Sequence, residues 1–249
     1  MLRLLTDSFP DDPALDTAVS RALMLRVAAG EVPEALRLSR PGKSVAFGKR
    51  DVVSPGYPRA VQAARRGGYE AVERLAGGRA AVFHDGTIAL AHAVPDPDPR
   101  SHVDERFEST AGLLAAALAR LGVEARVGEV PGEYCPGAHS VNARGERKLI
   151  GVGQRLVAGG VHVGGVVVVT GSERVSEILI PVYEALGLDW RPETTGAVAD
   201  EVSGATWEAV SQAIVEEYAR HIDVEPASLD EETLQLARRL APEHLSPAG

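Results

Sequence analysis

The spacing of apolar residues along the chain predicts a series of amphipathic helices. Between residues 14 and 29 apolar side chains recur every three or four positions, and Pro13 suits the first turn of a helix. The clearest helical pattern runs from Val103 to Leu121 and ends at Gly122. The same spacing predicts further helices over residues 58–66, 173–186, 206–222 and 229–240.

Short apolar runs bounded by glycine and proline predict strands between these helices. The longest are Lys148–Ala158 and Val161–Thr170, which Gly159-Gly160 joins as a hairpin. Residues 166–169 are all valine, so we expect the second strand to lie centrally in a sheet. Other strands are expected over residues 35–38, 44–48, 69–75, 80–83 and 87–94. The resulting fold class is α+β, with a mixed, largely antiparallel sheet flanked by helices.

Composition limits the kind of protein that this sequence can form. A chain of 249 residues with 45% hydrophobic residues can bury a large core, and we expect a main domain over residues 1–225 followed by a helical extension over 226–249. The start of the chain has no signal-peptide core, and the apolar stretch at residues 159–170 is too short to cross a bilayer, so a cytoplasmic protein with no membrane partner is expected. A formal net charge of −9 argues against nucleic acid as a partner.

The single cysteine, Cys135, is the first candidate for chemistry. It lies in the segment Gly132–Gly137, next to Pro136, and proline and glycine disfavour the interior of helices and sheets. We therefore expect a loop, where nucleophiles are often placed. A reactive thiolate needs a nearby positive charge, and Lys148 could supply it. The alternative is a small buried side chain without chemistry.

A second candidate is the segment Arg74–Gly86. Its paired glycines, Gly77-Gly78, could let backbone N–H groups converge on an anionic or carbonyl group, although such a pair between strands is commonly a tight turn. The spacing fits neither the dinucleotide fingerprint nor the P-loop. His84-Asp85 could form an acid/base pair, but neighbours in a strand point to opposite faces, which favours a turn.

Taken in order, these segments resemble a known superfamily. Arg74-x-x-Gly77-Gly78-x-Ala80, the Cys135 loop and the run Arg147–Arg155 are similar to lipoate-protein ligases, octanoyltransferases and biotin-protein ligases, over about residues 1–220. The segments Tyr134–Gly137 and Pro41–Gly48 most resemble the cysteine-dependent octanoyl (lipoyl) amidotransferase branch.

The resemblance implies a function and a set of site residues. It implies transfer of an octanoyl or lipoyl group to a lysine of lipoyl carrier proteins, namely the glycine-cleavage H protein or dehydrogenase E2 lipoyl domains, with no cofactor. Cys135 would receive the acyl group as a thioester, and Lys148 would contact its carbonyl. The implied substrate-binding residues are Arg74, Gly77, Gly78, Arg79, Ala80, His84, Gly137, Gly151 and Gly153. The seven histidines show no zinc-ligand spacing, and no metal site is expected.

Departures from the family pattern leave alternatives open. Arg79 stands where the ligases usually carry a third glycine, and we expect it to intrude on the space of an adenylate. The alternatives are a lipoate-protein ligase that uses ATP and magnesium, with Cys135 incidental, and a non-catalytic acyl-binding protein. His139 could serve as a base, whereas His92 and His162 are expected to be structural.

Overall fold

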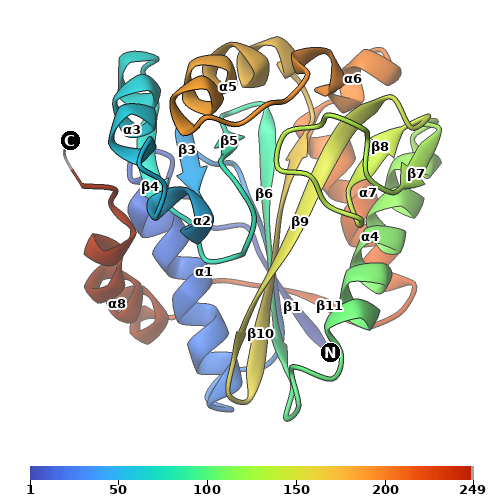
Figure 1. The fold of residues 1–249 in the computed structure, drawn as a ribbon. Coiled ribbons are helices and arrows are strands. Elements are labelled where there is room, and N and C mark those ends of the chain that lie inside the picture. Colours follow the sequence, from blue (N-terminus) through green and yellow to red (C-terminus); the bar gives the residue numbers. More distant parts are fainter. Residues whose placement is uncertain (248–249) are drawn as a thin grey trace.

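The chain forms two neighbouring sheets flanked by helices in the computed structural model, which describes residues 1–247 (Figure 1). The larger sheet contains, in spatial order, β11 (Val224–Ala227), β1 (Leu2–Leu5), β2 (Ala35–Ser39), β6 (Thr87–Pro95), β10 (Gly160–Val168), β9 (Arg147–Val157), β8 (Val141–Ala143) and β7 (Ala125–Val127). β1 pairs in parallel with β11 and β2, and the other neighbours are antiparallel. The predicted α+β class with a largely antiparallel sheet is confirmed, and β10 lies centrally as its valine run indicated.

A smaller sheet and the helices complete the molecule. The smaller sheet has the order β4 (Glu70–Glu73), β3 (Ser44–Phe47) and β5 (Ala81–Phe83). The helices are α1 (Pro13–Ala28), α2 (Lys49–Val52), α3 (Tyr57–Arg66), α4 (Val103–Arg120), α5 (Ser172–Leu186), α6 (Val198–Glu201), α7 (Trp207–Ala219) and α8 (Glu231–Leu240), with 3₁₀ turns at η1 (Pro192–Thr194) and η2 (Ala241–His244). Within residues 1–247 no helix has the length and apolar character needed to cross a membrane.

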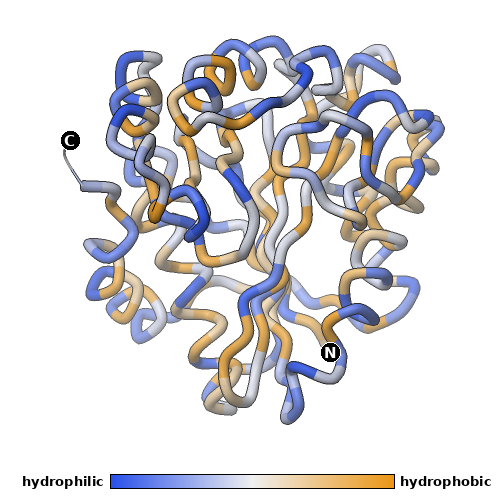
Figure 2. The backbone as a smooth tube through the Cα atoms, viewed as in Figure 1, coloured by the Kyte–Doolittle hydropathy of each residue, from blue (hydrophilic) through white to orange (hydrophobic). Residues whose placement is uncertain are grey.

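The helices bury their apolar faces in three clusters. α4 and α7 cover one face of the larger sheet, where Leu114 and Ile214 join Leu36 and Ile88 in the core. α1 covers the other face, α8 packs on the outer side of α1, and α3 and α5 pack around the smaller sheet (Figure 1). Figure 2 shows hydrophobic residues running through the central strands, whereas α2 is hydrophilic. Burial of these apolar faces is the main term favouring the fold.

The predicted helices and strands are all present, with ends that shift by a few residues. The hairpin between β9 and β10 is confirmed, but its two-residue turn is Ala158-Gly159, because Gly160 already pairs with Val157. Gly159 supplies the positive φ, +83°, that this turn needs. Six short strands and α-helices of the described residues had no sequence prediction, namely β1, β7, β8, β11, α2 and α6, and neither had the 3₁₀ turns η1 and η2.

The structure corrects the interpretation of Gly77-Gly78 as a tight turn between paired strands. β4 and β5 do not pair with each other, because each pairs with β3, one parallel and one antiparallel. Residues 74–80 therefore cross the end of β3 as an open loop. Gly48, directly after β3, lies against this loop: a Cβ atom at Gly48 would be 2.1 Å from the Gly78 carbonyl oxygen. Only glycine allows this approach.

The C-terminal residues pack closely against the start of the chain. β11 spans the expected boundary at residue 225 and pairs with β1. Next to it, Arg26 of α1 forms ion pairs with Asp230 and, at 2.7 Å, with Glu232 at the start of α8. Division of the chain into a main domain and an extension stays a prediction.

Candidate active site

A cavity of about 540 Å³ lies beside the loop that carries Cys135. Its walls come from α1, β3, β6, α4, β9 and β10, together with residues 74–78 and 134–140. Most lining residues are buried or half-buried, but Gly77, Pro136 and Ala138 are exposed, so the cavity opens between these two loops. We call Ala76–Gly78 the lip and Val130–Ser140 the cysteine loop.

Cys135 lies at the mouth of this cavity, on a loop as predicted. Its φ of +44° falls in the left-handed region, which is uncommon for a residue with a side chain. The backbone N–H of Cys135 donates to the Tyr183 hydroxyl at 2.8 Å, and that hydroxyl donates to the Ala80 carbonyl at 3.0 Å. Tyr183 thus joins α5 to the cysteine loop and to the residue before β5, which fixes the position of the thiol.

Two donors approach the thiol. The backbone N–H of Arg79 lies 3.1 Å from Cys135 Sγ, and Arg74 Nη2 lies 3.4 Å from it. Burial raises the pKa of the Cys135 thiol, but the positive charges of Arg74 and Lys148 and the Arg79 N–H outweigh burial, so the pKa is lowered. Arg74 is the larger of the two charge effects, whereas the sequence pointed to Lys148. A lowered pKa increases the thiolate fraction near neutral pH.

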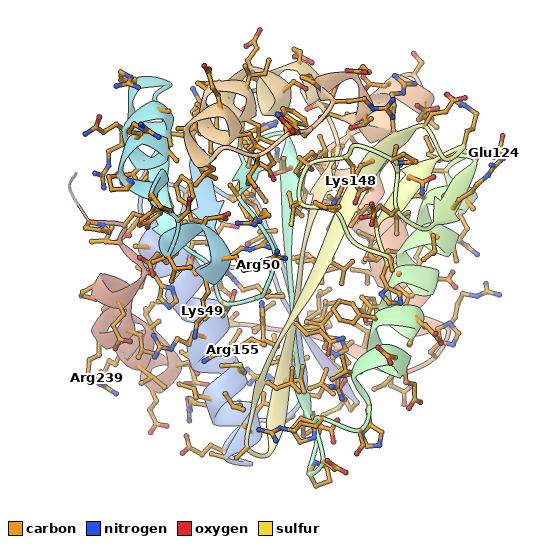
Figure 3. The ribbon with its side chains drawn as sticks, in the orientation of Figure 1. Lys49, Arg50, Glu124, Lys148, Arg155 and Arg239 are labelled. Carbon is orange, nitrogen blue, oxygen red and sulfur yellow. The ribbon has the colours of Figure 1, made fainter. Side chains whose placement is uncertain are left out.

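Lys148 is buried beneath the cysteine loop, where its ammonium group uses all three of its donors (Figure 3). Nζ donates to the Cys135 carbonyl at 2.7 Å, to the Tyr134 carbonyl at 3.0 Å and to Glu133 Oε1 at 3.0 Å. Lys148 therefore holds the two peptide bonds that flank Cys135, one before it and one after it.

Glu133 is the residue that sequence reasoning missed at this site. Its buried carboxylate accepts from the N–H groups of Val130 and Gly137, each at 3.1 Å, and from the Ser140 hydroxyl at 2.5 Å, besides its ion pair with Lys148. A buried charge is tolerated when it is paired and hydrogen-bonded in this way. The only signal in the sequence was an acidic residue two positions before the cysteine.

The glycines expected at the site lie around the cavity. A Cβ atom at Gly78, where φ is +107°, would be 2.0 Å from Arg74 Nη2 and 2.7 Å from Cys135 Sγ. Gly78 therefore lets Arg74 and the thiol meet beneath the lip. Gly151 and Gly153 form a smooth wall on β9, and Gly137 lines the cavity beside the cysteine loop. Gly77 forms the exposed part of the lip.

Three residues that were expected to bind substrate are not among the residues that line the cavity. His84 is fully buried outside the cavity, in the turn before β6, where its Nδ1 accepts from Gly86 N–H at 2.9 Å. Ala80 is also buried and holds the Tyr183 hydroxyl through its carbonyl. The Arg79 side chain does not line the cavity and forms an ion pair with Asp51 at 3.2 Å, while its expected effect on the space of an adenylate stays a prediction. Asp51 lies on α2, which the sequence analysis did not predict because a helix of four residues is too short to recognise from spacing.

The three other histidines considered in the sequence analysis divide between two environments. His139 lines the cavity and stacks on Phe107 of α4, with ring centroids 4.9 Å apart. His162 also lines the cavity, although it was expected to be structural, and burial lowers its pKa to about 4. His92 lies outside that cavity and contacts Glu34 at 2.7 Å. No cluster of three or more metal-ligand side chains occurs in residues 1–247.

Comparison with known proteins places this chain in a family. The profile of the lipoyl protein ligase A/B catalytic domain matches residues 12–219. The chain belongs to this family. A family relative from Geobacillus kaustophilus, octanoyl-[GcvH]:protein N-octanoyltransferase, is 32% identical over 170 residues, which are 68% of this chain and 60% of that protein. Lipoyl-[GcvH]:protein N-lipoyltransferase of Listeria monocytogenes is 26% identical over 208 residues, covering 78% of this chain and 74% of that protein.

Solved structures of the lipoyl ligase family share the fold. A bipartite lipoate protein ligase from Thermoplasma acidophilum superposes with a TM-score of 0.74 and 20% identity, covering 97% of this chain and 92% of that one. Lipoate-protein ligase A bound with ATP superposes with a TM-score of 0.78 and 21% identity, covering 97% and 94%. The matched region of the Geobacillus relative is less than two thirds of its length.

Proposed function

We propose that this protein transfers an octanoyl or lipoyl group between lysines of lipoyl carrier proteins through a thioester on Cys135. The observation that carries the proposal is the Cys135 thiol itself, which has a lowered pKa and lies at the mouth of the cavity beneath Arg74 and the Arg79 N–H. The names of the relatives, which act on octanoyl- or lipoyl-[GcvH], support the glycine-cleavage H protein as a carrier. We propose E2 lipoyl domains as the other carriers.

The proposed reaction has two balanced steps. In the first, the Cys135 thiolate attacks the carbonyl carbon of the acyl-lysine amide, a C–S bond forms, the C–N bond breaks, and the departing lysine amine takes a proton. In the second, the amine of the acceptor lysine attacks the thioester, loses a proton and releases the thiolate. One amide replaces another, so the exchange needs no ATP, and we propose that no cofactor takes part.

The surrounding residues have distinct proposed roles. Arg74 stabilises the thiolate, and Arg74 and the Arg79 N–H are the donors that we assign to the oxyanion of the tetrahedral intermediate, because both already reach the reacting sulfur. Lys148 and Glu133 position the cysteine loop, and contact of Lys148 with the acyl carbonyl requires it to exchange one of its three present acceptors. The glycine walls at Gly151 and Gly153 leave room for the acyl chain.

An exchange assay without ATP tests this function. Octanoylated H protein, an unmodified E2 lipoyl domain and the purified enzyme are mixed, and the mass of the E2 domain is followed. We expect octanoyl transfer by the unaltered enzyme and none by Cys135→Ala. A second reaction supplies free octanoate, ATP and magnesium in place of the octanoylated carrier. Octanoylation only in this second reaction, with full activity in Cys135→Ala, would instead assign the ligase activity.

A further inference from the structure

Given the proposed function, we infer that Lys49, Arg50 and Arg155 form a cationic rim that docks an acidic patch of the carrier protein beside its acyl-lysine. Lys49 and Arg50 begin α2, and Arg155 lies on β9. The two α2 residues are exposed and Arg155 is half-buried. Among residues 1–247 none of these three side chains has an ion-pair partner. Their charge is therefore available to another molecule.

The cationic rim borders the lip on two sides. On one side, the lip is followed by Arg79, whose Nη1 donates to the Arg50 carbonyl at 3.2 Å, and Gly78 is in close contact with the residue before Lys49. On the other side, the Gly77 N–H donates to the Gln154 carbonyl at 3.4 Å, next to Arg155. Figure 3 shows Lys49, Arg50 and Arg155 together on one side of the molecule, in front of α1 and β10.

The cationic rim lies beside the route by which the acyl-lysine would reach Cys135. The cavity opens at Gly77 and Pro136, so an acyl-lysine of a carrier must pass the lip to reach Cys135. The surface of the carrier around that lysine then rests on the cationic rim. An acidic patch is the complement of this surface, and it would be repelled elsewhere because the chain carries a formal net charge of −9.

Charge on the opposite side of the mouth sets the orientation of the carrier. His139 of the cysteine loop stacks on Phe107 of α4, and Asp104 and Glu108, the exposed acidic residues of this helix nearest Phe107, flank that contact, whereas Glu105 lines a separate pocket. The mouth is therefore positive on the α2 side and negative on the α4 side. A carrier with carboxylates on one side of its acyl-lysine would bind in a single orientation, with those carboxylates toward α2.

The test measures binding of unmodified H protein to the enzyme at low and high salt. The variants are Lys49→Glu and Arg50→Glu, with Arg239→Glu as the matched control. Arg239 is exposed, has no ion-pair partner in the described chain, and lies on α8 at the outer edge of the molecule, beyond α1 from the cationic rim (Figure 3). The substitution Arg239→Glu changes the net charge of the protein by the same amount as each rim substitution. The rate of Cys135 alkylation by neutral iodoacetamide confirms that each variant retains the folded site.

We expect each rim variant to weaken H-protein binding by about threefold to fivefold at low salt, with the difference lost near 1 M salt, where the Debye length is about 3 Å. Arg239→Glu should bind like the unaltered enzyme. Equal binding by the rim variants, or equal weakening by Arg239→Glu, overturns the docking proposal. Binding requires no acyl transfer, so salt-dependent binding without transfer would count against the proposed catalysis and leave the docking surface in place.

Discussion

At the scale of single residues, the reactivity of Cys135 depends on charge that comes from an unexpected place. Arg74 reaches the sulfur directly, and its Nη2 also donates to the Gly77 carbonyl, which keeps the guanidinium beneath the lip. Lys148, whose ammonium is paired with Glu133, contributes a second, smaller lowering of the pKa of the Cys135 thiol. Arg74 therefore governs the ionisation of the thiol, and Lys148 governs the shape of the loop.

This division of roles predicts how thiol alkylation depends on pH. The alkylation rate rises as the thiol ionises, so a lowered pKa places its midpoint below that of an ordinary cysteine. Arg74→Gln removes the nearest cation and should raise the midpoint by about one pH unit or more. Arg79→Gln keeps the backbone N–H at the sulfur and should leave the midpoint nearly unchanged. An equal rise in both variants would show that Arg74 has no special role.

At the scale of elements, the site depends on segments that are distant in the sequence. The location of Cys135 on a loop could be predicted, because Pro136 and the neighbouring glycines act locally on the backbone. The strand that pairs with β5 could not be predicted from the sequence. β5 pairs with β3 and not with β4, and packing across the whole layer decides this choice. The Tyr183 contact was equally hidden, since the sequence of α5 does not show which residues its single tyrosine contacts.

Tyr183 gives a prediction at the scale of elements. Tyr183→Phe removes the hydroxyl that accepts from Cys135 N–H and donates to the Ala80 carbonyl, leaving both groups without this partner. We expect a loss of about 1–3 kcal/mol in the free energy of unfolding, measured with urea, and a lower transfer rate. Tyr218→Phe is the control, because it removes a buried hydroxyl beside His92, away from Cys135. A normal transfer rate in Tyr183→Phe would exclude a positioning role.

At the scale of the whole molecule, the N-terminal and C-terminal segments support the wall of the cavity beside Cys135. Pro13, Asp16 and Thr17 of α1 line the cavity, and α8 covers α1 from outside. Hydrophobic periodicity predicted both helices, but their contact joins residues more than two hundred positions apart, for example Arg26 and Asp230. Patterns within a segment do not encode such a partner.

The C-terminal segment gives a prediction at this scale. Removal of the residues from Val224 onward takes away the parallel partner of β1 and the cover of α1. The melting temperature should fall by about 10 °C or more, since 1 kcal/mol corresponds to about 2–4 °C for a chain of this size. Arg26→Ala, which removes the ion pairs to α8, should cause a smaller fall. An unchanged melting temperature in the truncated protein would support a separate extension after residue 225.

The central claim is that Cys135 takes an acyl group from a carrier without ATP. The most direct measurement is the intact mass of the enzyme after incubation with octanoylated H protein alone, followed by acid quenching. We expect a fraction of the enzyme to gain one octanoyl group, to lose it on treatment with hydroxylamine at neutral pH, and to gain none in Cys135→Ala. An enzyme that never gains the group while still transferring it to an acceptor, or that gains it equally in Cys135→Ala, would contradict the thioester mechanism.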